Sequence, residues 1–374
     1  MNSTYNKRGI WREIKFQSRR VRYIGTSLRS ISLEKTLADI ERYLLTCDVE
    51  AQFAMAQLDV SDTFRSVLEY LSPLDETRSQ IYFGKGTNGK QSLVSAFMEF
   101  VERTLAEMKP EDELLEASFK EIAYKACDPS LFSLSPESAF TQNMKLDWIW
   151  GYSLTRAQPV LVPANLVFCP YEASRKTKPI SWSDSNGLAS GNNLEEAVLH
   201  GILELLERDA VVISEYNQMP LAEITTEGFP VEVLQLLEHL SASGYDWSFR
   251  SIPTDIPIPV VAAFLQKREE PANCCAAFGC HVDPSLAVSR ALTEAVQLLP
   301  PSINQEEWYQ SGSAQRYINQ APKEIPFSSL KNLAQSDLKD NIEMCMAMLK
   351  DIGSEVIMVD LSLPEIPFSA VRML

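Results

Sequence analysis

SNGLASGNNLEEAVLHGILELLERDA, residues 185–210, is the most informative part of this sequence. Its first half is rich in glycine, serine and asparagine and predicts a loop, and the apolar periodicity that follows predicts a long helix over 194–214. At about 100° per residue, Glu204 and Glu207 project about 80° and 20° from Glu196, so the three carboxylates share one stripe. The surrounding positions are strongly apolar. Carboxylates on a mostly buried helix must be paired, hydrogen-bonded or bound to a metal.

A second helix carries the same pattern. The periodicity predicts a helix over 92–108, on which Ser95, Glu99 and Glu102 share one stripe opposite an apolar face. The motif Glu-x-x-Glu-Arg is therefore present on both helices. Two carboxylates one turn apart can share a divalent cation, and Mg²⁺ prefers carboxylate oxygens together with phosphates and water. Glu294, on a third predicted helix, would add another carboxylate.

The alternative interpretation of these stripes is structural. A single Glu-x-x-Glu-Arg is common on solvated helix faces, where charge pairs only support the helix. Two copies on apolar helices, one of them entered through a loop near Asn192, favour a Mg²⁺–phosphate site with a helix N-terminus open to an anion.

Strands and helices are mixed along the rest of the chain without a break in composition. The fold class is therefore α+β (mixed α/β), with long acidic-striped helices packed on β-sheets in a single integrated domain. We expect a basic N-terminal arm over 1–23, the domain over 24–374, and a loop over 187–193. Further helices are predicted over 33–44, 231–240, 285–299 and 338–349, and strands over 81–83, 148–150, 160–162, 166–168, 247–252, 259–265, 274–279 and 356–359.

Composition places the chain among soluble globular proteins. Its 374 residues are 45% hydrophobic and 22% charged, which excludes disorder and disulfide-rich scaffolds. No apolar stretch approaches the roughly 20 residues that cross a bilayer. The polar N-terminus lacks the apolar run of a signal peptide, so we expect a cytoplasmic protein without a membrane partner. Cys274, Cys275, Cys280 and His281 lack the paired spacing of zinc sites, and we expect reduced thiols in a buried strand.

Charge argues against nucleic acid as a partner. Residues 1–30 carry eight basic side chains and one acid, so subtracting +7 from the net charge of −16 leaves −23 on the remaining residues. A body this acidic repels the phosphates of nucleic acids. The basic arm is either a solvated terminal segment or a source of bases that contact a phosphate or the body.

A competing nucleotide motif precedes the first acidic helix. Gly84-x-x-x-x-Gly89-Lys90 matches most of a P-loop, and the strand that ends at Asp360 is similar to a Walker B strand. However, Gln91 replaces the Ser or Thr that would hold Mg²⁺, and a P-loop leaves both glutamate stripes unexplained. We therefore favour a nucleotide site on the acidic helices.

Several spaced motifs together resemble the YcaO family, and the resemblance covers roughly residues 24–372. The stretch 185–210 closely resembles the family signature. The other matching parts occur in order: Gly84-Lys-Gly, Ser95-x-x-x-Glu99-x-x-Glu102-Arg103, the strands within 153–163, and Ala291-Leu-Thr-Glu294-Ala-Val-Gln297. The coincidence of several motifs in the right order makes the resemblance specific.

The resemblance implies ATP-dependent activation of a peptide-backbone amide, with Mg²⁺ ions that bridge glutamates and phosphates. The substrate would be a ribosomally synthesised precursor peptide (a RiPP), in which Cys, Ser or Thr residues close to azolines, the first step of thiazole/oxazole-modified peptide biosynthesis. Carried over residue by residue, it implies nucleotide contacts from Ser95, Asn192, Glu196, Arg208 and, by a weaker match, Arg29. It implies Mg²⁺ ligands at Glu99, Glu102, Glu204, Glu207 and Glu294. It assigns no catalytic base.

Two alternatives stay open. Related members form a thioamide beside a partner called TfuA, and Gly25-Thr-x-x-Arg29-x-x-Ser32 is similar to that branch. The other alternative is a non-catalytic accessory protein, because the family normally continues past the last strand and we expect a shortened C-terminal end without the Pro-rich tail of azoline-forming members. No leader-peptide-binding domain is recognisable, so we expect an E1-like or TfuA-like partner protein, and a homodimer is compatible with the sequence.

Overall fold

The chain forms two compact units in the computed structural model, in which residues 8, 13–24, 27–46, 51–57, 63–71, 79–171, 177–299, 316–320 and 323–374 are described. The first unit consists of Met1–Arg20, Met98–Leu205 and Asp337–Leu374, and the second of Val21–Phe97 and Leu206–Ser336. The boundary falls inside helices α2 (Gly89–Ala106) and α4 (Leu194–Tyr216), so both acidic helices contribute residues to both units. None of the described helices has the length and apolar character needed to span a membrane.

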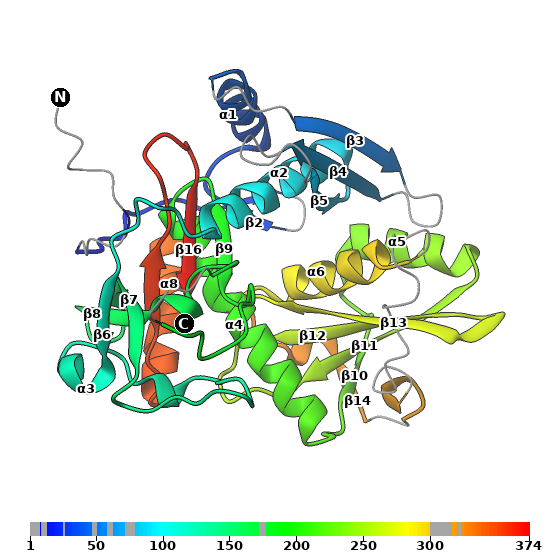
Figure 1. Ribbon diagram of the computed structural model, residues 1–374. Coiled ribbons are helices and arrows are strands. Elements are labelled where there is room, and N and C mark those ends of the chain that lie inside the picture. Colours follow the sequence, from blue (N-terminus) through cyan, green and yellow to red (C-terminus); the bar gives the residue numbers. More distant parts are fainter. Residues whose placement is uncertain are drawn as a thin grey trace. The chain divides into compact units, whose positions relative to one another are not determined.

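The first unit is built on a six-stranded antiparallel sheet with helix α8 (Leu338–Asp351) against it (Figure 1). Its strands are β6 (Leu115–Ser118), β7 (Lys145–Ser153), β8 (Gln158–Pro163), β9 (Leu188–Gly191), β15 (Ile357–Asp360) and β16 (Ser369–Met373). They follow the order β6-β7-β15-β16-β9, and β8 pairs with β7. The short elements of this unit are helix α3 (Phe119–Ile122) and the 3₁₀ turns η1 (Pro129–Leu131) and η2 (Ala164–Leu166).

The second unit contains three sheets. Their strands are β1 (Arg22–Ile24), β2 (Ser27–Arg29), β3 (Ala51–Gln57), β4 (Phe64–Leu71), β5 (Ser79–Gly86), β10 (Ala222–Thr225), β11 (Tyr245–Ile252), β12 (Val260–Lys267), β13 (Glu270–Cys280) and β14 (Glu324–Pro326). The orders are β1-β2, β3-β4-β5 and β13-β12-β11-β10-β14, antiparallel except for the parallel pair β10–β14. The remaining elements are α1 (Leu33–Thr46), α5 (Val231–Ala242), α6 (Pro284–Gln297) and η3 (Phe327–Ser329).

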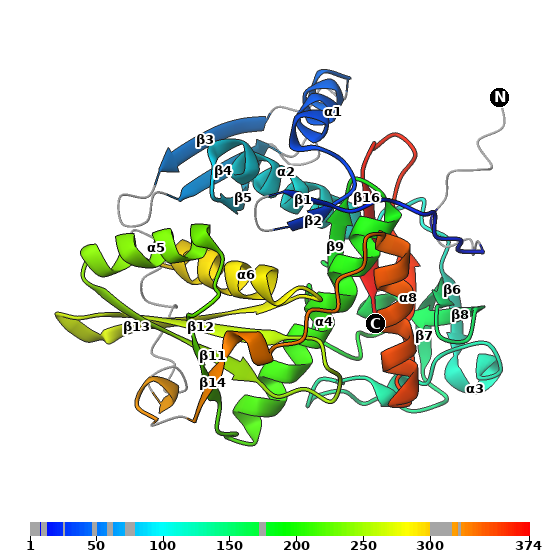
Figure 2. The same ribbon diagram turned by 180° about the vertical axis from the view of Figure 1, so that it is seen from behind.

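The core of the second unit lies between the five-stranded sheet and helices α5 and α6, which cover one face of that sheet (Figure 2). On α6, Ala287, Ala291 and Ala295 recur every four residues and are fully buried, so a stripe of small side chains faces the sheet. Arg290 and Glu294, one turn apart, project about 100° and about 60° from the middle of this stripe, so both lie along its flank. The packing of the apolar stripe thus decides which way Glu294 points.

Most of the predicted helices and strands are confirmed within a few residues, and two predictions are wrong. The stretch 187–193, predicted as a loop, contains strand β9, whose register pairs Leu188 with Arg372 of β16. The stretch 166–168, predicted as a strand, follows η2 and turns instead, because the Val167 and Phe168 amides both donate to the Ala164 carbonyl at 3.0 Å. The predicted domain limits at 1–23 and 24–374 stay a prediction.

Replacement of Phe249 by Ala tests the core of the second unit. Phe249 is 1% exposed, and its ring meets that of Phe229 edge to face at 5.0 Å between centroids. We expect Phe249→Ala to lower the free energy of unfolding by about 3–5 kcal/mol, because it removes this ring and leaves a cavity. The midpoint of urea unfolding measures the change. Val231→Ala, at a position 64% exposed on α5, is the control and should change the midpoint little.

Candidate functional site

Helix α4 begins with an asparagine cap next to two predicted nucleotide contacts. The Asn193 side-chain oxygen accepts the Glu196 amide at 3.1 Å, and the Asn193 carbonyl accepts the Ala197 amide at 3.2 Å. The Glu196 carboxylate in turn accepts the backbone and side-chain N–H groups of Asn192 at 3.1 and 2.8 Å. The structure therefore brings Asn192 and Glu196 together at a helix N-terminus, where the helix dipole favours an anion.

The basic arm fastens the first turn of α4. The Glu195 side chain is 2% exposed and accepts the Gln17 amide at 2.6 Å and the Arg19 Nε at 2.7 Å. Beside it, the Ser18 hydroxyl donates to Asp337 at 2.6 Å. Arg19 is therefore a basic residue of the N-terminal arm that contacts the body of the protein, one of the two interpretations of the arm given above. Through Glu195 it holds the helix turn that carries Glu196.

The first unit holds one group of acids, contributed by α2 and α4. Glu102 and Glu204 are half-buried, and the Glu99 carboxylate lies 4.0 Å from Arg103. Burial raises the pKa of Glu102 well above its usual range, the charge of Glu204 raises it further, and Arg103 offsets only part of the rise. The charge of Glu204 thus opposes the ionisation of Glu102, and a divalent metal bound to both would relieve this repulsion.

The second unit holds the other group of acids, Glu207 on α4 and Glu294 on α6. The buried Glu207 accepts the Cys280 amide at 2.9 Å. Burial raises its pKa, and the charge of Glu294 raises it further. Burial acts in the same direction on Glu294, but Lys85, whose Nζ lies 2.7 Å from its carboxylate, together with Arg290 and Arg208 more than offsets this and leaves the pKa of Glu294 lowered. The pKa values of this pair are therefore shifted in opposite directions.

The remaining predicted nucleotide contacts are Arg208, Ser95 and Arg29, and the first two are close in sequence to these acids. Arg208 is exposed on α4 directly after Glu207, and Ser95 is half-buried on α2 one turn before Glu99. Arg29 lies at the end of β2 and is half-buried. Its charge acts on His281, whose pKa is lowered to about 3 by burial, by Arg290 and by Arg29, so this imidazole is neutral at ordinary pH.

The structure does not form a P-loop at Gly84–Lys90. Gly84 and Gly86 lie inside strand β5, and only Thr87 and Asn88 separate that strand from α2, which is too short a loop to wrap phosphates. Both glycines instead permit close packing: a Cβ on Gly84 would lie 2.0 Å from the Ser92 carbonyl oxygen. The proposed Walker B strand β15 lies in an antiparallel sheet rather than a parallel one.

The donor set fits Mg²⁺ bound together with phosphates. Within the described part of the chain, no three His, Cys, Asp or Glu side chains are grouped closely enough to hold a metal on their own. Each unit instead offers a pair of carboxylates, in which Glu204 raises the pKa of Glu102 and Glu294 raises the pKa of Glu207. Mg²⁺ is commonly held by one or two carboxylates plus water and substrate phosphates, so these pairs match its chemistry.

Sequence reasoning missed three basic residues that face these acids. Arg372 on β16 acts on Glu102, Arg290 acts on Glu207 and Glu294, and Lys85 pairs with Glu294. Only Arg290 left a usable signal, because it stands one helical turn before Glu294. The other two are brought to the acids by strands that are distant in sequence.

Comparison with known proteins identifies the class. The model of the YcaO family, described as YcaO cyclodehydratase, ATP- and Mg²⁺-binding, matches residues 83–374. That span is most of the chain, so the chain belongs to the YcaO family, as its motifs predict. ATP and Mg²⁺ are the cofactors of this family.

Individual relatives agree with this assignment. An uncharacterised protein in the tfuA 3′ region of Rhizobium leguminosarum bv. trifolii is 30% identical over 284 residues, which are 72% of this chain and 66% of that protein. YcaO from Methanopyrus kandleri, solved with AMPPCP and Mg²⁺, is 26% identical with a TM-score of 0.77 and covers 95% of this chain and 93% of its own. A heterocyclase solved with substrate and cofactor has a TM-score of 0.82 at 21% identity over 97% of this chain. This chain spans 54% of that heterocyclase.

Neutralising Glu102 should stabilise the metal-free protein at high pH. The folded-state pKa of Glu102 lies above the ordinary value of 4.5. The contribution of this raised pKa to the free energy of unfolding is therefore fully present below pH 4.5 and is lost as pH rises through the raised pKa. Glu102→Gln keeps a neutral side chain at every pH. We therefore expect a Tm advantage over the natural sequence that grows from pH 5 to pH 9 in EDTA, measured by thermal unfolding.

The control for this prediction is Glu215→Gln, at an exposed position on α4, which should show no such trend. A Tm difference between Glu102→Gln and the natural sequence that stays constant or shrinks with pH would contradict the assignment of a raised pKa to Glu102.

Removing Arg19 should loosen the start of α4. Arg19→Met leaves the buried Glu195 carboxylate with one fewer charged donor, and we expect a loss of about 1–3 kcal/mol in the free energy of unfolding. Lys15→Met is the matched control, because the Lys15–Glu13 pair is 77% and 61% exposed and should contribute little. Equal unfolding curves for the two variants would show that the arm does not fasten the helix.

Proposed function

We propose that this protein uses ATP and Mg²⁺ to activate a backbone amide of a ribosomally synthesised precursor peptide, and so forms azoline heterocycles from Cys, Ser or Thr. The observation that carries this proposal is the set of carboxylate pairs on α2, α4 and α6, in which a neighbouring acid raises the pKa of Glu102 and of Glu207 and which a bound cation would balance. The family description as an ATP- and Mg²⁺-binding cyclodehydratase supports it. The similar fold of a heterocyclase solved with substrate and cofactor supports the choice of a ring-forming reaction.

In this proposal, the acids of both helices hold Mg²⁺ and nearby groups hold the nucleotide. Glu99, Glu102, Glu204, Glu207 and Glu294 are the Mg²⁺ ligands, and Ser95, Asn192, Glu196, Arg208 and Arg29 are the nucleotide contacts. Glu204 and Glu207 lie one turn apart on α4, so both carboxylates project from the same side of the helix. The exposed guanidinium of Arg208 follows directly and is suited to pair with a phosphate oxygen.

The bound ATP would supply a phosphoryl group to the oxygen of the attacked amide. The substrate hydroxyl or thiol would lose its proton and bond to the carbonyl carbon, and the former carbonyl oxygen would take the γ-phosphoryl group as ADP departs. That oxygen would then leave as phosphate while the amide nitrogen loses its proton and the C=N bond of the ring forms. The residues of this chain contribute positioning: the asparagine cap and Glu196 fix the start of α4, and Glu195 and the arm hold that turn in place.

Thioamide formation with a TfuA-like partner is the second candidate. The specific observation in its favour is the 30% identity to a protein in the tfuA 3′ region of a rhizobial genome. The reaction would use the same nucleotide and acids, with sulfide in place of the substrate side chain. Incubation of the precursor peptide with ATP, with or without sulfide and the partner, distinguishes the two by mass, because ring closure removes one water and thioamide formation exchanges oxygen for sulfur.

Calorimetry of Mg²⁺–ATP binding tests the site. We expect saturable binding by the natural sequence and a loss of at least tenfold in affinity for both Glu204→Gln and Glu207→Gln, because each removes a charged Mg²⁺ ligand. Glu215→Gln on the same helix is the control and should bind as the natural sequence does. Binding that survives both changes but disappears in Lys90→Ala would move the site to the P-loop-like motif and overturn the assignment.

A further inference from the structure

Lys85 lies between Gly84 and Gly86 in strand β5, so this Gly-Lys-Gly sequence is extended and does not form a phosphate-binding loop. Side chains alternate along strand β5, so Gly84 and Gly86 face one side and Lys85 faces the other. The glycine side lies directly on α2: a Cβ on Gly86 would meet the Ser92 amide at 2.7 Å. Because the strand is pressed against α2 on that side, the Lys85 side chain is directed to the opposite side, where α6 lies.

There Lys85 pairs with one of the proposed Mg²⁺ ligands. Its Nζ lies 2.7 Å from the Glu294 carboxylate, and both side chains are about one third exposed, 33% and 34%. The charge of Glu294 also raises the pKa of the buried Glu207, and Arg290 and Arg208 act on both of these acids. The ammonium group of Lys85 is the base that an ion pair places directly on Glu294, a carboxylate that the proposed function assigns to a divalent cation.

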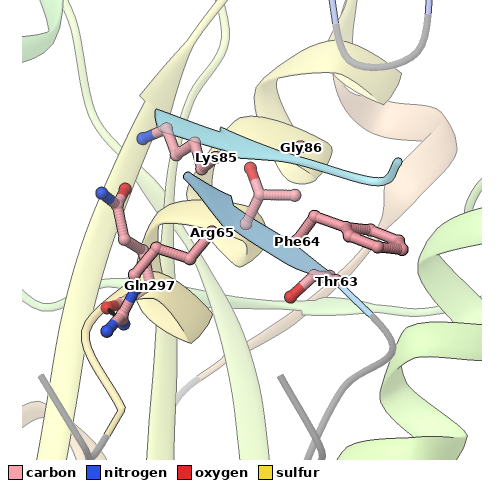
Figure 3. A pocket seen from close by; sticks show the side chains of 7 residues that line it. Thr63, Phe64, Arg65, Lys85, Gly86 and Gln297 are labelled. Carbon is pink, nitrogen blue, oxygen red and sulfur yellow. Dashed lines mark hydrogen bonds between the residues drawn. The ribbon is translucent and has the colours of Figure 1, made fainter. Parts of the chain in front are cut away.

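The surroundings allow this ammonium group to leave. Lys85 lines a small pocket in the second unit with Thr63, Arg65, Thr293 and Gln297 (Figure 3). The pocket has a volume of about 10 Å³, which is room for one water molecule. Lys85 is thus in contact with solvent, and its long flexible side chain can turn away from Glu294 without opening the core.

We propose that Lys85 is the resident counter-ion of Glu294 and that Mg²⁺ must displace it in order to bind. The inference rests on the proposed function, because it takes Glu294 as a Mg²⁺ ligand. In the metal-free protein, Lys85 balances the charge of Glu294 directly, while Arg290 and Arg208 act on both Glu207 and Glu294. On metal binding, the Lys85 ammonium group gives up the carboxylate, so the ion pair sets a threshold for the metal concentration at which the site fills.

Direct metal binding tests the proposal without any turnover. The probe is Mn²⁺, whose free form is counted by electron paramagnetic resonance as it is titrated into the full-length protein without nucleotide. We expect Lys85→Met to bind Mn²⁺ about three- to fivefold more tightly than the natural sequence, which is the competition that a partly exposed ion pair can supply. We expect its Tm in EDTA to fall, because the acids have lost their counter-ion.

Three further variants isolate the charge of Lys85. Lys85→Arg keeps the charge and should match the natural sequence within twofold. Lys90→Met, at an exposed position on α2 outside the site, should also match it. In a Glu294→Gln background, Lys85→Met should no longer change Mn²⁺ affinity, because no carboxylate remains at position 294 for which Lys85 and the metal compete. If Lys85→Met does not fold, Lys85→Gln takes its place.

The possible failures are distinguishable. Equal or weaker Mn²⁺ binding by Lys85→Met than by the natural sequence, or no Mn²⁺ binding by either, overturns the counter-ion proposal even if the natural sequence binds Mg²⁺–ATP in calorimetry. A gain that persists in the Glu294→Gln background also overturns it. Absence of Mg²⁺–ATP binding by the natural sequence instead removes the proposed function on which the inference rests.

Discussion

Mutual repulsion between carboxylates is the constraint around which the site residues of this protein are organised. Burial and the charge of a neighbouring acid oppose the ionisation of Glu102 in the first unit, beside Glu204, and of Glu207 in the second, beside Glu294. Such pairs lower the stability of the metal-free chain and are tolerated only with counter-charges or a cation. Each pair has basic residues beside it, Arg103 and Arg372 in the first unit and Lys85, Arg208 and Arg290 in the second.

The rest of the structure holds the helices that carry these acids. The start of α4 is capped by Asn193 and tied down through Glu195 to the arm. Helix α6 is oriented by its alanine stripe against the five-stranded sheet, which leaves Glu294 along the flank of that stripe. Strand β5 lies on α2 through Gly84. Small residues and helix caps thus hold the backbone of these helices and strands in place. The backbone in turn sets the directions in which the long charged side chains point.

The long helices and their stripes could be predicted because their signals are local. An apolar periodicity over a dozen or more residues specifies a helix, and the same periodicity places Glu204 and Glu207 on one side of it. Strand β9 could not be predicted in this way, since its Leu-Ala-Ser-Gly sequence has no strand pattern of its own and becomes extended only by pairing with β16. The prediction of a strand over 166–168 was wrong because its apolar residues are buried in a turn. Hydrogen bonds to the Ala164 carbonyl hold that turn.

The sequence by itself determined the fold class, the family, and the identity of the acids on each helix, because these follow from residue types at fixed spacings within single elements. Only the tertiary structure decided which acids are neighbours and which basic side chains lie beside them. Glu207 and Glu294 come from helices far apart in the sequence, and Lys85 and Arg372 reach the acids from strands whose register is set by sheet pairing. Electrostatic coupling depends on distance in space, and no local pattern of residues encodes that distance.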